Sequence, residues 1–181
     1  SVYTELGTFG TAPMMIDRDF ETVIRCRSFT FGEYVLANNA RLEVDTFGRH
    51  IRMSARNLVG LFGEEVLPTA VVRAASERPF SRFSVYHLIE PNEEKYPLHP
   101  LERKKPYVSV YWMPDAPRDG ILQAKGYSEF PIMAPRWDTL GPHVYGMGPG
   151  WEALPDAKQL MVLEMDKLTG IEKAYDPPLQ A

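Results

Sequence analysis

Four histidines and one cysteine are the side chains that could supply metal-binding or nucleophilic chemistry in this sequence. The histidines lie far apart, and none has the spacing of a metal-ligand pair; they are His50, His87, His99 and His143. Cys26 falls in a strand-like run, and a buried free thiol is commoner than a catalytic one. The sequence therefore predicts no metal site, no catalytic residue and no cofactor.

Two glycine-rich segments could bind an anion through backbone N–H groups, residues 7–10 (GTFG) and residues 146–150 (GMGPG). Neither segment carries the lysine and hydroxyl pair of a phosphate-binding loop. The second precedes a helix N-terminus, where an anion could bind. A turn that only starts the helix is the simpler interpretation, and a small anion-binding enzyme stays open as one alternative.

A basic triplet and three tryptophans are the remaining candidates. Arg103, Lys104 and Lys105 could contact DNA phosphates or an acidic partner, although an isolated triplet is more often a solvated loop. The aromatic and aliphatic candidates for a subunit interface are Trp112, Trp137, Trp151 and Leu163. Core positions explain the tryptophans equally well at this stage.

Composition limits the class of protein. The 181 residues are 44% hydrophobic, which is enough for one core-containing domain. A net charge of −4 shows no global basic field. The single cysteine excludes an internal disulfide and fits a reducing compartment. No apolar run approaches the roughly 20 residues of a membrane span, and no signal peptide is visible. Because the ends look cut, we expect an internal fragment of a longer protein.

Strand-period and helix-period segments come in separate blocks, which predicts an α+β fold with small, mostly antiparallel sheet regions and short helices. A helical turn over residues 1–6 should be broken by the glycines that follow, and Asn38-Asn39 should form a hairpin turn. Strands are expected at 13–16, 22–29, 32–37, 42–53, 83–89, 108–112 and 121–127. Short helices are expected at 55–62 and 68–78, the first with Ser54 as its N-cap.

The longest predicted helix, residues 150–175, follows the second glycine-rich segment. Its apolar side chains recur at steps of three and four, and others widen the arc, so a second surface could also be covered. The residues of the main stripe are Leu154, Ala157, Met161, Met165 and Leu168. Asp176-Pro177-Pro178 should end the helix, because neither proline can donate to it.

Five stretches, in this order along the chain, resemble the head-to-tail connector, or portal, proteins of short-tailed bacteriophages and related prophages. A PRW stretch, a YGxGPG stretch and an LPDxKQL helix start form the specific combination. The stretches are 5–11 (ELGTFGT), 107–112 (YVSVYW), 126–137 (GYSEFPIMAPRW), 144–168 (VYGMGPGWEALPDAKQLMVLEMDKL) and 176–179 (DPPL).

The resemblance implies a non-enzymatic ring component, typically of about twelve subunits, set at the portal vertex of the virion capsid after assembly in the host cytoplasm. Double-stranded DNA would be packaged and ejected through the ring. Its implied partners are capsid protein, a packaging terminase, and tail or adaptor proteins, with no membrane. Residues 1–53 would be a wing-like β region, 54–79 short helices leading into the clip, 80–140 a clip-like β region, and 141–181 a loop and a long stem-like helix. A β-rich interaction module of another assembly remains a second alternative.

Overall fold

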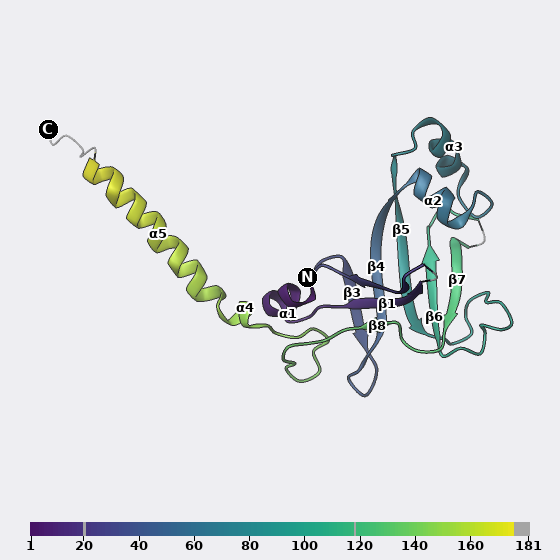
Figure 1. The fold of residues 1–181 in the computed structure, drawn as a ribbon, viewed down its shortest axis with the longest axis horizontal. Helices are drawn as coiled ribbons and strands as arrows, with labels where there is room; N and C mark the ends of the chain where they lie inside the picture. Colours follow the sequence, from purple (N-terminus) through teal and green to yellow (C-terminus); the bar gives the residue numbers. More distant parts are fainter. Residues whose placement is uncertain (20, 118, 176–181) are drawn as a thin grey trace.

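The structure, a computed structural model, describes residues 1–19, 21–117 and 119–175 and has an α+β fold (Figure 1). The predicted stop at Asp176-Pro177-Pro178 lies outside the described residues. The helices are α1 (Val2–Phe9), α2 (Ala55–Phe62), α3 (Thr69–Glu77), α4 (Pro149–Glu152) and α5 (Leu154–Tyr175). The strands are β1 (Met14–Asp19), β2 (Val23–Ser28), β3 (Tyr34–Asn38), β4 (Val44–Ser54), β5 (Arg82–Pro91), β6 (Tyr107–Trp112), β7 (Ile121–Tyr127) and β8 (Ile132–Met133).

The main sheet is an antiparallel meander in which β3, β4, β5, β6 and β7 follow one another in sequence order. Period-two alternation predicted the strands themselves, because each strand turns alternate side chains to opposite faces of the sheet. The sheet joins strands from residues 1–53 to strands from residues 80–140. The boundary expected between those two segments is therefore crossed by the long β4–β5 pairing.

One face of the main sheet is covered at both ends, and the cover comes from two different sources. At one end α2 and α3 pack on it, with Leu58, Val71 and Val85 in a shared core. At the other end lies the three-stranded sheet β2-β1-β8. There Phe29 and Ile132 meet the main sheet's own buried residues in a second core.

Local signals explain most of the element boundaries. Ser54 caps α2 as expected, since its Oγ accepts a hydrogen bond from the N–H of Asn57 at 3.4 Å. Two local expectations were wrong. Gly7 lies inside α1, and Gly10 ends that helix in a left-handed conformation at φ 76°. The β3–β4 connection is also longer than a two-residue turn, and Leu42 takes a positive φ of 63° within it.

The two glycine-rich segments pack directly against each other. A Cβ on Gly10 would lie 2.4 Å from the backbone N of Gly148, and a Cβ on Gly146 would lie 2.3 Å from the carbonyl O of Gly10. The contact is fixed by hydrogen bonds from the N–H of Gly146 to Thr11 Oγ1 at 2.7 Å and from the N–H of Trp137 to the Gly10 O at 2.9 Å. Close backbone approach therefore explains these glycines, and it anchors the start of the C-terminal helices on α1.

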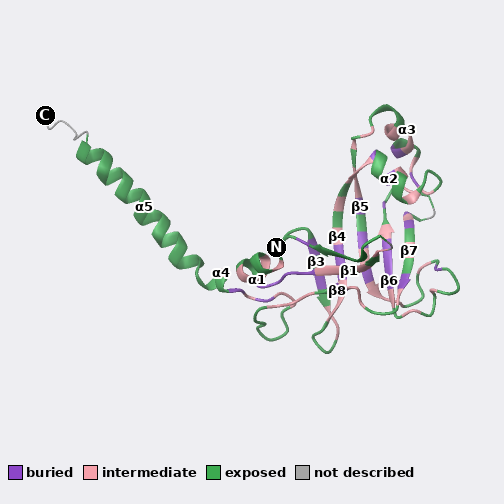
Figure 2. Ribbon diagram, viewed as in Figure 1, coloured by how far each residue is buried: buried purple, intermediate pink, exposed green. Residues whose placement is uncertain are grey.

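The predicted long helix is present, as a short α4 followed by the 22-residue α5. Every residue of α5 is exposed, and the helix projects away from both sheets (Figures 1 and 2). A helix that exposes this many apolar side chains is incomplete without a partner for them.

Candidate assembly surfaces

The other face of the main sheet carries an apolar hollow of about 660 Å³, next to a small core in which Leu98 of the β5–β6 connection covers Val108 and Val110. Its floor is made by alternate residues of four neighbouring strands, which the register places side by side: Val35, Gly48, Leu88 and Val110. Gly48 is needed there because a Cβ would lie 2.9 Å from a methyl of Val35. A shallow apolar hollow on a sheet face is suited to receiving another apolar surface.

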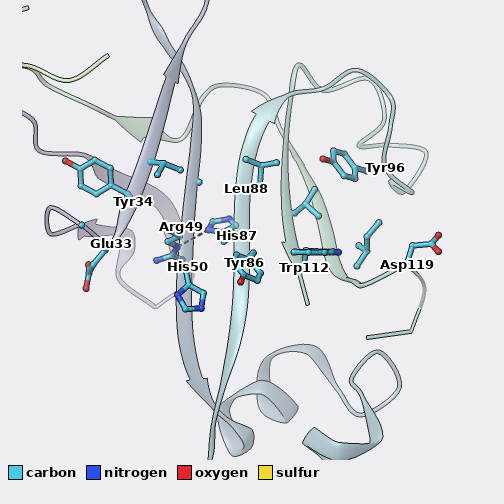
Figure 3. A pocket seen from close by; sticks show the side chains of 15 residues that line it. Glu33, Tyr34, Arg49, His50, Tyr86, His87, Leu88, Tyr96, Trp112 and Asp119 are labelled. Atoms are coloured by element: carbon cyan, nitrogen blue, oxygen red, sulfur yellow. Dashed lines mark hydrogen bonds between the residues drawn. The ribbon is translucent and has the colours of Figure 1, made fainter. Parts of the chain in front are cut away.

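A row of three aromatic rings crosses this hollow from β4 to β6 (Figure 3). The rings of His50 and Tyr86 are 5.1 Å apart, and those of Tyr86 and Trp112 are 5.2 Å apart. Tyr86 and Trp112 keep about two-fifths of their surface exposed. Of these three residues, only Trp112 was predicted from its residue type to be an interface candidate. The period-two pattern could have found the other two, since pairing His50 with Tyr86 and Tyr86 with Trp112 puts all three on one face.

On the opposite face, a buried polar cluster surrounds His87. The Nε of Arg49 donates to His87 Nδ1 at 3.0 Å, so the ring proton is on Nε2, which lies 2.8 Å from Ser109 Oγ. The ring also stacks on Tyr111 at 4.0 Å. Burial, and then the charges of Arg49 and Arg27, lowers the pKa of His87 to about 3.

Ser109, His87 and Arg49 are arranged like the nucleophile, the base and the third residue of a catalytic triad. The third residue, however, is a cation, whereas a triad has a carboxylate or carbonyl there. A catalytic base needs a carboxylate or carbonyl behind it to stabilise the imidazolium, whereas Arg49 destabilises that form. Ser109 is only 4% exposed. The geometry instead gives a fully hydrogen-bonded polar network that fixes the register of β4, β5 and β6.

The three residues of the basic triplet do not share one environment. Lys105 is half-buried, and its Nζ donates to the carbonyl O of Gly126 at 3.1 Å and pairs with Glu102 at 3.5 Å. Arg103 and Lys104 are exposed. Lys105 therefore ties the β5–β6 connection to β7, and two of the three charges point to solvent.

The proposed interface residues are all on the surface but are not brought together. Trp137 and Trp151 are 59% and 62% exposed, so the core alternative fails for them, and Trp112 lies in the hollow. Trp151 lines a second apolar pocket, of about 530 Å³, at the root of α5, where the rings of Phe9 and Phe31 stack at 4.7 Å. Leu163 is 56% exposed on α5.

Within residues 1–19, 21–117 and 119–175, no group of three or more histidine, cysteine or acidic side chains could hold a metal ion. None of the helices in those ranges combines the length and the apolar character needed to cross a membrane. Cys26 is exposed on β2 and not buried as the strand pattern suggested.

Comparison with known proteins gives consistent matches over the whole chain. A sequence profile described as "Bacteriophage head to tail connecting protein" matches residues 1–181. The chain is 38% identical over 182 aligned positions to a protein named "Portal protein" from Salmonella phage epsilon15. It is 34% identical over 181 positions to a "Probable portal protein" from Bordetella phage BPP-1. The alignments cover 99% of this chain and 33% of each relative, so the chain spans about a third of their length.

Proposed function

Since this chain belongs to the family of bacteriophage head-to-tail connecting proteins, we propose that it forms part of a portal subunit, a structural ring component without catalytic activity. In this role the ring stands at the portal vertex of the capsid, and double-stranded DNA is packaged and ejected through it. Its further partners are capsid protein, a packaging terminase, and tail or adaptor proteins. Assembly takes place in the host cytoplasm, and the ring has about twelve subunits, the number that the resemblance to portal proteins implies.

The observation that carries this proposal beyond the family match is the unpartnered state of α5. Residues two apart on a helix lie about 200° apart, so Leu163 faces away from both Met161 and Met165. All three are more than half exposed. Apolar side chains on opposite sides of one helix suit a subunit that touches two identical neighbours, as every subunit of a closed ring does.

The sheet hollow is a second surface that supports assembly. Trp112 and Tyr86 have the composition of interface hot spots, and both line the apolar hollow while staying about two-fifths exposed. Trp151 and Trp137 are further contact candidates on the side near α1 and α4. Each surface is distinct, which fits a head-to-tail contact between different patches of neighbouring subunits.

We assign the parts of the chain to the parts of a portal subunit as follows. Residues 1–53 are wing-like, 54–79 lead into the clip, 80–140 are clip-like, and 141–181 form the loop and the stem-like helix. The exposed, rod-like α5 supports the stem assignment. The shared main sheet implies that the wing-like and clip-like parts form one rigid body, because β4 and β5 pair over eight positions.

Assembly of the complete gene product tests the proposal. Trp112→Glu and Leu163→Glu should each reduce ring formation in mass photometry at micromolar concentration by more than they destabilise the subunit. Leu163→Glu should leave thermal unfolding close to unchanged because every residue of α5 is exposed, whereas Trp112→Glu loses the ring contact with Tyr86. Matched controls are Gln123→Glu, on the other face of the sheet, and Gln159→Glu on α5, and both should assemble normally. A complete gene product that stays monomeric at every salt concentration would contradict the proposal.

A further inference from the structure

Four exposed arginines and an exposed phenylalanine come from elements that meet at the end of the main sheet that carries α2 and α3. Figure 1 shows this end of the sheet. Phe80 is 78% exposed, in the short connection between α3 and β5. The arginines come from four different elements, and we call the group the tip patch: Arg52 on β4, Arg56 on α2, Arg78 at the C-cap of α3, and Arg82 on β5.

Backbone pairing holds the tip patch together. Ser54 pairs with Arg82 across β4 and β5, which places Arg52 and Arg82 on the same sheet face as diagonal neighbours. The N–H of Arg56 donates to the carbonyl O of Pro79 at 3.1 Å, and the N–H of Ser81 donates to the carbonyl O of Arg78 at 2.9 Å. The four side chains therefore start from a fixed backbone frame rather than from a mobile loop.

The charge of the tip patch is of one sign. Among the described residues, none of the four arginines forms an ion pair within 4 Å. The acid nearest in sequence, Glu77, is held by Arg73 at 2.8 Å. Glu64 and Glu65 lie in the connection between α2 and α3. Because the whole chain has a net charge of −4, the tip patch is a local basic surface on an acidic protein.

We propose that the tip patch binds the phosphate backbone of duplex DNA. The planar guanidinium fork matches a phosphate with two hydrogen bonds. Arg52 and Arg82, as diagonal neighbours on paired strands, start about 7–8 Å apart, so they can engage two different phosphates. An acidic protein partner would also need apolar anchor pockets for stable binding. The tip patch has only one apolar side chain, Phe80. Its mainly cationic surface therefore suits the repeating phosphates of DNA better than it suits an acidic protein.

This inference deepens the proposed function, since it gives the DNA a named contact surface, but it needs no ring for its test. The 181-residue chain is titrated into a fluorescein-labelled 20-base-pair duplex, and anisotropy is read between 50 and 200 mM salt. Four phosphate contacts predict a log–log salt slope of about −3.6. In Arg78→Gln/Arg82→Gln the slope should fall to about −1.8, with affinity at low salt weakened by about tenfold or more.

The matched control removes two charges elsewhere. Lys158→Gln/Lys173→Gln on α5 changes the net charge equally, and it should leave slope and affinity close to those of the unaltered chain. Equal losses in the two double variants would overturn the inference, because binding would then follow net charge. Tighter binding of a poly-glutamate peptide than of the duplex would overturn it as well. If the complete gene product forms rings but the tip patch variants bind DNA as well as the unaltered chain does, the DNA inference is refuted and ring assembly stands. If the tip patch variants lose DNA binding but the complete gene product forms no rings, ring assembly is refuted and the DNA inference stands.

Discussion

Substitution of Gly148 by alanine should destabilise the protein through backbone crowding. Gly148 has φ −97° and ψ 165°, which any residue adopts, so backbone strain is not the cause. Its Cβ would lie 2.7 Å from the carbonyl O of Leu6, 2.8 Å from the N of Gly10 and 2.9 Å from the O of Gly7. All three atoms are backbone atoms of α1 or its cap, so no flexible side chain can move aside.

The size of the effect follows from the displacement. Ordinary contact begins near 3.4 Å, so α1 or α4 must withdraw by 3.4 − 2.7, about 0.7 Å, at the tightest point. Overpacking of this kind costs about 1–3 kcal/mol. Alanine also lowers the unfolded-state entropy, which offsets about 0.4–1 kcal/mol. The net loss of about 1–2 kcal/mol corresponds to a Tm lower by about 2–8 °C for a chain of this length.

A thermal melt followed by circular dichroism measures this change. Gly60→Ala is the matched control, because a Cβ at that position in α2 meets nothing within 4 Å and should raise stability by about 0.5–1 kcal/mol. The two substitutions have the same chemistry and opposite expected signs. A Gly148→Ala protein that melts at or above the original temperature would show that the two glycine segments are not tightly packed.

Two further predictions concern the polar interior and the basic triplet. Since the pKa of His87 is lowered to about 3 from 6.5, the unfolded state binds its proton first, and stability should fall by about 1.4 kcal/mol per pH unit as pH drops from 6 to 3.5. Urea unfolding against pH should show a shallower dependence in His87→Gln, and an unchanged slope would refute the assignment. Lys105→Met should lower stability by about 1 kcal/mol through the lost bond to Gly126, whereas Arg103→Gln/Lys104→Gln should melt normally because both side chains are exposed. Equal melting temperatures for Lys105→Met and Arg103→Gln/Lys104→Gln would mean that Lys105 is only a surface charge.

Period and capping signals predicted most of the fold. The ranges 55–62 for α2 and 121–127 for β7 agree with the structure. Ser54 and Gly63 mark the ends of α2, and the segment 114–120, with its prolines and glycine, marks the start of β7. What the sequence could not show was which strands pair. The joining of β4 to β5 depends on long-range packing across the α2–α3 hairpin, and that information is absent from local periodicity.

The candidate surfaces were predicted less completely. Trp112 was selected by residue type alone, and its partners His50 and Tyr86 emerge only from the register of the sheet. Lys105 looked equivalent to Arg103, yet its fixed position depends on the carbonyl of Gly126, far along the chain. The exposure of a tryptophan cannot be read from its identity, since a core position and an interface position favour the same side chain.

The paired glycine segments connect the fold to the proposed assembly. Two short motifs separated by more than a hundred residues are interpretable separately as anion loops or turns. In the structure they pack together, and their glycines let α1 and the start of α4 approach at backbone distance. This contact fixes where the rod of α5 leaves the body of the subunit. In a closed ring, an error in that direction is repeated at every subunit, so the exit angle must be held within a narrow range. Backbone-to-backbone packing is stiff enough to hold it, whereas side chains between the same elements would allow rotamer changes to alter it.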